Sequence, residues 1–380
     1  MRKPYRVIVV GTGGIGQPVL REIIRRPEFE LAGVLAFKPR KDGLDVGELL
    51  GQERVGIRIT TDQLAIASLD ADCVVWCGYF PMPHIEDAMD NFVIQALESG
   101  KNVVTPAAYH YPHLHGEEYV KKFEDACRRG NSCLHGTGEN PGFWFERVAL
   151  TLTGLCNDVE YIGIDEYCHL ALTTGSERMW NAAGYGVSVD QANQLSAFRE
   201  TWEKYFFVET LNLLSMSLWG KLLDKFEFKT DHYTCDESFE LYEANGDPFD
   251  MRFPKGTVHA LAHRFEGYID GKLRLYAATN NFMSPERSPF EGKKDSTWDI
   301  EIEGRPTSIR CNIAAQASFK DNLIFYPGDT TSPLYYASVG PIIQAIPVLC
   351  GHEPGIVYPS MFASSAPDLR ILESRNSVVG

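Results

Sequence analysis

The sequence predicts an α/β protein: a doubly wound parallel sheet comes first, and an α+β domain with an antiparallel sheet follows. Three observations support this fold class. Strand patterns and amphipathic helix patterns alternate through the first third of the chain. A glycine-rich turn at residues 11–16 lies between the first strand and the first helix. Beyond Phe143, longer strand patterns are separated by hairpin turn signals.

The first domain is expected to join each strand to the next through a helix, as a parallel sheet requires. Residues 84–99 carry apolar side chains at helical spacing, and Gly100 follows as a stop signal. Residues 72–77 are apolar almost throughout, as in a strand buried on both faces. The expected strands are 5–10, 30–37, 72–77, 102–105 and 132–135, and the expected helices are 17–26, 84–99 and 117–129.

The second domain is expected to be richer in strands. Asp270-Gly271 and Gly304-Arg305-Pro306 are turn signals between successive strand patterns. We expect strands at 158–168, 258–268, 272–278, 297–303 and 307–313, a mostly helical aromatic segment at 195–225, and a late helix at 336–350. The predicted domains are therefore 1–145, 146–335, and a C-terminal helix and tail, 336–380, that return to the first domain.

Composition indicates a soluble, cytoplasmic globular protein. The chain has 380 residues, is 44% hydrophobic and carries a formal net charge of -15, which disfavours nucleic acid and anionic lipid as partners. Nine scattered cysteines without a CxxC pair are typical of reduced thiols. No signal-peptide pattern and no apolar run of membrane-spanning length is present.

The turn Gly11-Thr12-Gly13-Gly14-Ile15-Gly16 fits the pattern G-x-G-x-x-G. In this motif Gly11 permits the tight turn, Gly13 lets the backbone approach a diphosphate, and Gly16 allows close packing of helix on strand. The N–H groups at the helix N-terminus then face the phosphates. Residues 1–145 are therefore predicted to be a dinucleotide-binding domain of the Rossmann type.

The second strand ends at Phe37, where an NAD-specific site usually offers an acidic residue to the ribose 2′-OH. This chain instead presents Lys38 and Arg40, with Lys41 after them. Cations here would attract a 2′-phosphate, so NADP(H) is the preferred cofactor, with NAD(H) as the alternative. Further cofactor contacts are expected from residues that follow later strands, namely Gly78, Tyr79, Asn140 and Pro141.

The chain resembles the dihydrodipicolinate reductase-like oxidoreductases, and within them the branch of 2,4-diaminopentanoate dehydrogenase and the native amine dehydrogenases. The resemblance is carried by residues 11–16, 38–47, 101–112, 136–143, 302–306 and 345–347. It implies a Rossmann domain, a second domain that covers the nicotinamide, and a homodimer formed through the open sheet. It also implies hydride transfer between NAD(P)H and a small carbonyl, imine or amine.

The chain departs from the family pattern at two places, one that concerns the substrate and one that concerns the catalytic carboxylate. The reductases carry HHxxKxDAPSG in the second domain, and residues 165–175 lack it, which disfavours dihydrodipicolinate as substrate. Amine dehydrogenases share a Glu just after the fifth strand, and that position falls on Ala107 or Ala108.

Candidates for the proton-transferring group follow the last two strands of the first domain. Glu139 lies in the loop that the resemblance places beside the nicotinamide, where burial would raise its pKa. We hypothesise that Glu139 replaces the missing family Glu; a solvent-facing loop residue is the alternative. Tyr109 and His110 follow the fifth strand and are further candidates, or cleft-lining rings. The spacing of His110, His113 and His115 matches no common zinc site, so no metal is expected.

A substrate wall is expected from Tyr111, Tyr167, His169 and Trp180, although core packing would equally explain these aromatic rings. Two other functions remain open. A non-catalytic redox sensor would keep the phosphate turn, and a sugar or inositol dehydrogenase would usually show E-K-P after the fifth strand, where this chain has Thr105-Pro106-Ala107.

Overall fold

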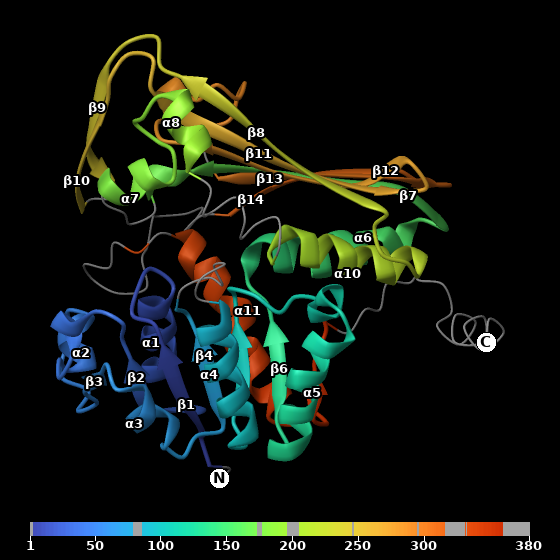
Figure 1. The fold of residues 1–380 in the computed structure, drawn as a ribbon. Helices are drawn as coiled ribbons and strands as arrows, with labels where there is room; N and C mark the ends of the chain where they lie inside the picture. Colours follow the sequence, from blue (N-terminus) through green and yellow to red (C-terminus); the bar gives the residue numbers. More distant parts are fainter. Residues whose placement is uncertain are drawn as a thin grey trace. The chain divides into compact units, whose positions relative to one another are not determined.

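A computed structural model describes residues 3–78, 86–172, 177–195, 205–244, 247–294, 296–315, 331 and 333–359. The chain divides into two compact units. Unit 1 comprises Met1–Phe143 and Tyr335–Tyr358, and unit 2 includes Trp144–Leu334. Each unit is described by itself below (Figure 1).

Unit 1 contains a seven-stranded parallel sheet in the order β15-β6-β5-β4-β1-β2-β3 (Figure 1). This confirms the predicted doubly wound fold. The strands are β1 (Tyr5–Val10), β2 (Phe29–Leu35), β3 (Ile59–Thr60), β4 (Cys73–Trp76), β5 (Asn102–Thr105), β6 (Cys133–Gly136) and β15 (Gly355–Ile356). The helices are α1 (Gly16–Arg25), α2 (Val46–Leu49), α3 (Gln63–Ala67), α4 (Glu86–Glu98), α5 (Glu117–Gly130) and α11 (Pro333–Leu349), with one-turn helices η1 (Pro39–Lys41) and η2 (Pro112–His115).

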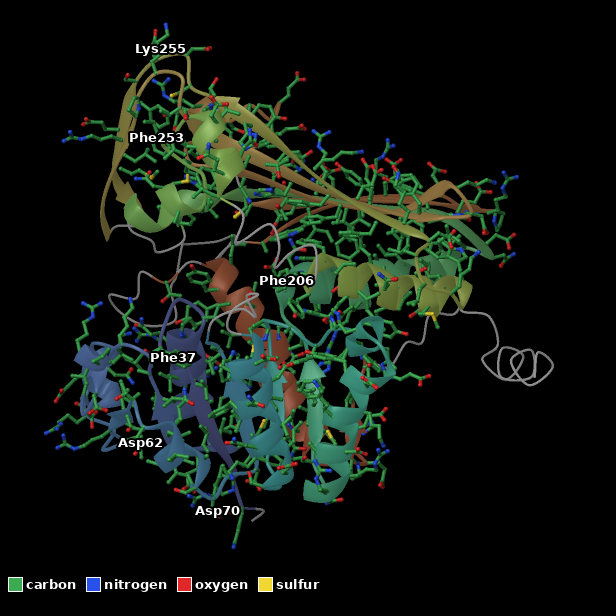
Figure 2. All side chains as sticks on the ribbon, in the orientation of Figure 1. Phe37, Asp62, Asp70, Phe206, Phe253 and Lys255 are labelled. Carbon is green, nitrogen blue, oxygen red and sulfur yellow. The ribbon has the colours of Figure 1, made fainter. Side chains whose placement is uncertain are left out.

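Alternation along β1 explains the two-sided core of unit 1. Val7 and Val9 face one hydrophobic cluster, which includes α1 and α11. Ile8 and Val10 face the other cluster, which includes α3, α4 and α5. All four β1 side chains are fully buried, as expected for a central parallel strand. Figure 2 labels Phe37 and Asp70 at opposite edges of this sheet, and Phe37 marks the carboxyl edge, where ligands bind in such folds.

Unit 2 is built on a six-stranded sheet in the order β14-β13-β7-β12-β11-β8. Its strands are β7 (Asp158–His169), β8 (Lys225–Thr234), β11 (Val258–Ile269), β12 (Lys272–Phe282), β13 (Thr297–Arg305) and β14 (Ile309–Ala314). A separate hairpin pairs β9 (Phe239–Ala244) with β10 (Asp247–Phe253). The helices are η3 (Glu139–Ala149), which begins in unit 1, α6 (Leu150–Leu152), η4 (Thr153–Leu155), η5 (Leu170–Leu172), α7 (Glu177–Ala182), α8 (Val189–Gln194), α10 (Phe207–Trp219) and η6 (Pro285–Arg287).

The α+β prediction for unit 2 is confirmed, with one difference in the sheet. β7 and β12 run parallel, whereas every other neighbouring pair is antiparallel, so the sheet is mixed. β8 was not predicted as a strand. Its Lys225-Phe-Glu-Phe-Lys run alternates with period two, but the predicted helical segment ended at Lys225 and no element was assigned between there and residue 258.

The two faces of the unit 2 sheet differ in chemistry. The helix-covered face carries Ile164, Ile300 and Phe265, and Phe207 of α10 stacks on Phe265 with ring centroids 4.0 Å apart. The opposite face, called the polar face here, carries Asp165 of β7 directly across from Asp299 of β13. Asn280 donates a hydrogen bond to Asp165 Oδ1 over 3.2 Å. Burial raises the pKa of Asp165 and the charge of Asp299 adds to the rise, while the hydrogen bond from Asn280 and the charges of Arg264 and Lys293 offset only part of it.

We predict that Asp165→Asn stabilises the protein at neutral pH. The pKa of Asp165 is higher in the folded protein than in the unfolded chain. Its contribution to stability is therefore fully present at pH below about 4, where the carboxyl is protonated in both states, and is lost as the pH rises through the folded pKa. At higher pH the buried carboxylate is destabilising, and asparagine removes that charge. Thermal unfolding should show a higher Tm for Asp165→Asn at pH 8 and no gain at pH 4. Asp299→Asn, which removes an ion pair with Lys293 (2.7 Å), is the control and should show no gain at pH 8. Equal Tm values for Asp165→Asn and the parent protein at pH 8 would contradict the prediction.

Candidate functional site

The glycine-rich turn has the geometry that its motif requires. Gly11 has φ +99°, and a Cβ there would lie 2.2 Å from the carbonyl oxygen of Cys77. A Cβ on Gly16 would lie 2.1 Å from the carbonyl oxygen of Gly11. A Cβ on Gly13, in contrast, would meet no atom within 4 Å. Gly11 and Gly16 therefore let the strand and helix close together, while Gly13 leaves open space beside the turn.

The turn fits a dinucleotide diphosphate. α1 begins at Gly16, with Ile15 as its N-cap, and no side chain caps it. The first N–H groups of a helix lack partners inside the helix, and they attract an anion. Thr12 is buried at the base of the turn. The open space at Gly13 is where the backbone approaches the phosphates in such folds.

The residues after β2 present cations and no available carboxylate. The side chains of Lys38 and Arg40 are exposed; Lys38 is the N-cap of the one-turn helix η1, and Arg40 lies within it. The acidic residues that follow are engaged elsewhere. Asp42 Oδ1 accepts hydrogen bonds from the backbone and hydroxyl of Thr61. Asp45 caps α2 through Gly47 N and also accepts two further backbone N–H groups, which lower its pKa.

Gly78, Asn140 and Pro141, which were also predicted to contact the cofactor, lie at the same edge of the unit 1 sheet. Gly78 follows β4, and a Cβ there would lie 3.0 Å from the rings of Phe37 and Trp76. Asn140 and Pro141 stand at the start of η3 and are joined by a cis peptide bond. Tyr79 lies outside the described residues.

The loops that follow β5 and β6 pack tightly on each other. Thr137 N donates to Thr105 O over 2.9 Å, and a Cβ on Gly136 would lie 2.4 Å from the backbone of Tyr109. His110 Cε1 lies 3.2 Å from the position of a Cβ on Gly142, so the His110 ring lies against the loop that carries Glu139. Both His110 (2% exposed) and Glu139 (9% exposed) are buried.

The Glu139 loop is irregular. Phe143 N donates to Gly138 O, five residues back, over 2.9 Å, and Asn140 has extended backbone angles inside the helical segment. This wide π-type turn is uncommon in proteins and occurs often at functional sites.

Tyr109 occupies a different place from its neighbour His110. The Tyr109 hydroxyl donates a hydrogen bond to Asp90 Oδ1 of α4 over 2.6 Å, and its ring packs on Phe123 of α5. Its backbone has φ 63°, which turns the side chain into the core between α4 and α5. This environment gives Tyr109 a packing role, and we leave it out of the proposed chemistry.

The histidines after β5 contact different partners. The Nδ1 atom of His113 lies 2.6 Å from the hydroxyl of Tyr358, and the ring of His115 packs on Tyr119. The predicted substrate residue Tyr111 stacks on His113 and lies at a tilt to Tyr358, and burial raises its pKa. Within the described ranges, no group of three or more His, Cys, Asp or Glu residues is arranged to hold a metal ion.

The predicted substrate residues of unit 2 lie in two separate environments. Tyr167 and His169 project from β7 on the same side as Asp165; Lys293 Nζ lies 4.3 Å from the centre of the Tyr167 ring, and His169 stacks on Phe282. Trp180 lies in a hydrophobic cluster with Tyr185 and Met251. Trp180 thus has the core-packing environment that the sequence left open as an alternative.

Sequence reasoning missed a polar row on the helix-covered face of unit 2. Glu166 of β7 lies directly between Thr279 of β12 and Trp298 of β13. The hydroxyl of Thr279 and the Nε1 atom of Trp298 are buried and have no hydrogen-bond partner among the described residues. The alternation of β7 indicates that Glu166 shares the face of Ile164, but its neighbours depend on a register that one sequence does not reveal.

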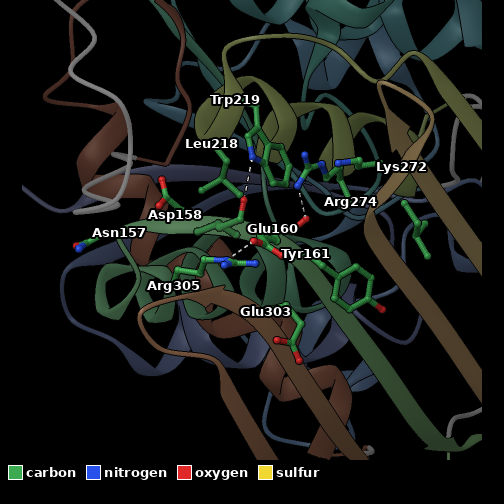
Figure 3. Close-up of a pocket in the computed structure, with 12 residues that line it drawn as sticks. Asn157, Asp158, Glu160, Tyr161, Leu218, Trp219, Lys272, Arg274, Glu303 and Arg305 are labelled. Carbon is green, nitrogen blue, oxygen red and sulfur yellow. Dashed lines mark hydrogen bonds and ion pairs between the residues drawn. The ribbon is translucent and has the colours of Figure 1, made fainter.

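A surface cavity of about 810 Å³ lies at the beginning of β7, at the opposite end of that strand from Tyr167 and His169 (Figure 3). Its polar groups bind one another. Arg305 pairs with Glu160 over 2.6 Å, and the Trp219 indole donates to the carbonyl oxygen of Val159. None of the sequence-predicted site residues lines it.

Comparisons with known proteins agree with this picture. Residues 5–105 match the family described as dihydrodipicolinate reductase, N-terminus. A protein named amine dehydrogenase from Streptomyces virginiae is 24% identical over 356 residues, which cover 92% of this chain and 93% of that protein. A 2,4-diaminopentanoate dehydrogenase from Acetoanaerobium sticklandii is 20% identical over 293 residues, covering 74% and 77% of the two chains.

Among solved structures, an amine dehydrogenase from Mycobacterium smegmatis has the same fold. Its TM-score is 0.70 at 18% identity, with 96% of this chain and 97% of that chain covered. The predicted resemblance to the dihydrodipicolinate reductase-like and amine dehydrogenase proteins is therefore confirmed. Within the described part of the chain, no helix has both the length and the hydropathy needed to cross a bilayer.

We predict that Tyr109→Phe affects stability and leaves any catalytic activity nearly unchanged. Losing the hydrogen bond to buried Asp90 should lower the free energy of unfolding by about 1–2 kcal/mol. Tyr119, which also donates to Asp90, supplies the matched control Tyr119→Phe. Urea unfolding and turnover measurements on both variants check this. A loss of kcat of about 100-fold in Tyr109→Phe alone, at unchanged stability, would instead place Tyr109 in the chemistry.

Proposed function

We propose that this chain is an NAD(P)(H)-dependent oxidoreductase that transfers hydride between the nicotinamide and a small carbonyl, imine or amine. The observation that carries the proposal is the geometry of the phosphate turn. Backbone atoms pack directly against Gly11 and Gly16, whereas no atom lies within 4 Å of the position of a Cβ on Gly13. The likeness to proteins named amine dehydrogenase over nearly the whole chain supports this reaction class.

The positions of the residues suggest which part of the reaction each would serve. The turn amides and the N-terminus of α1 bind the diphosphate. The bound nicotinamide supplies hydride to, or accepts it from, the substrate carbon. Reduction of a C=O or C=N carbon also requires a proton on the heteroatom, and oxidation requires its removal. Glu139, buried in the loop after β6, is proposed to hold that proton, with His110 beside the same loop.

Glu139 is proposed because the position of the family carboxylate is apolar here. Ala107 and Ala108 follow β5 and are both buried, and Ala107 N donates to the hydroxyl of Thr105. A proton carrier must therefore come from another loop. Among described residues of unit 1 at this edge, Glu139 is a buried carboxylate whose loop packs directly on the one after β5.

NADP(H) is proposed as the preferred cofactor. Lys38 and Arg40 are exposed at the end of β2, and the nearby carboxylates of Asp42 and Asp45 are held by other groups. A 2′-phosphate would meet cations there, and a bare 2′-OH would find no free carboxylate acceptor among these residues.

A homodimer is proposed to form through the polar face of the unit 2 sheet, as the resemblance implies. Three half-buried tyrosines, Tyr161, Tyr167 and Tyr276, lie near Asp165 on this face. Aromatic residues of this type are enriched in protein interfaces. The nine cysteines are all free thiols, which supports the cytoplasmic location expected from the sequence.

Gly13→Ala should abolish cofactor binding without unfolding the protein. The added Cβ meets no protein atom within 4 Å, so it enters only the space proposed for the diphosphate. We expect the Kd for NADPH to rise about 100-fold or more, with Tm nearly unchanged. Gly340→Ala, where a Cβ also meets nothing within 4 Å, is the matched control and should bind normally. Normal NADPH affinity in Gly13→Ala would remove the turn from the cofactor site.

Glu139→Gln tests the proton carrier. NADPH oxidation should be followed with a panel of small ketones, with and without ammonia. We expect kcat to fall about 100-fold or more, while NADPH affinity changes less than about threefold. Glu146→Gln, a similarly buried residue farther along η3, is the control and should keep its turnover. Unchanged turnover in Glu139→Gln would exclude Glu139, and tight cofactor binding without any turnover in the parent protein would favour the redox sensor.

A further inference from the structure

Lys41 links the segment after β2 to the phosphate turn. Its Nζ atom donates to the carbonyl oxygen of Thr12 over 2.7 Å and to the Thr12 hydroxyl over 3.0 Å. The two residues are 29 positions apart, and the Lys41 side chain is half-buried while those of Lys38 and Arg40 are exposed. The third cation of this segment therefore differs from the other two in both exposure and partner.

The contact with Thr12 sets the direction of the next amide. The carbonyl of Thr12 and the N–H of Gly13 belong to one planar trans peptide unit, in which they point in opposite directions. Because Lys41 donates a hydrogen bond to the Thr12 carbonyl oxygen, the Gly13 N–H points away from Lys41. Gly13 is also the residue whose Cβ position is open.

A second support lies on the other side of the turn. The ring of Tyr335, on α11, lies 2.6 Å from the position of a Cβ on Gly14. Residues from two segments that are distant in sequence thus confine Thr12 and Gly14, while Gly13 between them remains accessible.

The charges near Lys41 also indicate an anionic ligand. Burial and the neighbouring charges of Lys38 and Arg40 lower the pKa of Lys41. Three cations within four residues repel one another, and a phosphate group would relieve that repulsion.

We propose that Lys41 is a positioning residue of the dinucleotide site, which holds the Thr12–Gly13 peptide so that the Gly13 N–H binds the diphosphate. This inference rests on the proposed function. Because NADH and NADPH share the diphosphate, Lys41 supports both cofactors equally. Lys38 and Arg40, in contrast, act on the 2′-phosphate that only NADPH carries.

The test compares Lys41→Met with Lys38→Met and Arg40→Met in the full-length chain. The Kd values for NADH and NADPH are measured by fluorescence titration, and thermal unfolding checks the fold. Lys41→Met should raise both Kd values by the same factor, about tenfold, and raise both KM values with kcat at saturation within about twofold. Lys38→Met and Arg40→Met should weaken NADPH alone. Thr12→Val, which keeps the carbonyl, should have a smaller effect than Lys41→Met.

Several results would overturn this inference. Unchanged Kd values in Lys41→Met would show that the tether does not position the turn. Loss of NADPH affinity alone would make Lys41 another reader of the 2′-phosphate. A loss of affinity that only follows a lower Tm, and that Tyr119→Phe, a variant away from the turn, reproduces at the same Tm, would reduce Lys41 to a stability role. If the parent chain binds neither nucleotide, the proposed function fails before this test begins.

Discussion

The closure of the first strand–turn–helix crossover is the constraint on which the rest of this structure depends. The carbonyl oxygens of Cys77 and Gly11 occupy the space that side chains would need at residues 11 and 16. With any larger residue there, α1 could not approach β1 as it does, and this face of the sheet would lose one of its two main covering helices, with α11 as the other. The same closure leaves the N-terminus of α1 uncapped at the carboxyl edge, where it can meet an anion.

The other residues proposed for the site lie at this edge because parallel strands end together there. β2 is followed by the cationic segment, β4 by Gly78, β5 by His110 and β6 by the Glu139 loop. Backbone contact between Gly136 and Tyr109 holds the last two loops against each other. The chain departs from the amine dehydrogenase pattern at Ala107 or Ala108 on the β5 loop, and from the reductase pattern at residues 165–175 of unit 2.

Periodicity and glycine spacing were sufficient to predict the architecture. β1 and β5 have the predicted bounds, and the backbone packs against Gly11 and Gly16 as closely as the predicted turn requires. Side-chain direction in irregular segments was not predictable. Tyr109 and His110 looked equivalent in the sequence, but a positive φ at Tyr109 turns its ring into the core and away from the His110 side of the loop.

Contacts between residues that are distant in sequence were also not predictable. Lys41 was counted as one of three surface cations because nothing local indicates that it reaches back 29 residues to Thr12. The Glu166 row was missed for a similar reason, since it depends on which strands pair with β7 and in which register. The parallel pairing of β7 and β12 likewise joins segments too distant for a hairpin signal.

We propose that the turn at Gly13 binds the diphosphate of a pyridine nucleotide, and the other proposals depend on this. Isothermal titration calorimetry of the unmodified chain with NADPH, NADP+, NADH and NAD+ measures this binding directly. The account predicts one saturable site per chain, with a Kd at or below about 100 μM for at least one nucleotide and tighter binding of the 2′-phosphorylated form. Absence of saturable binding for all four nucleotides would contradict it.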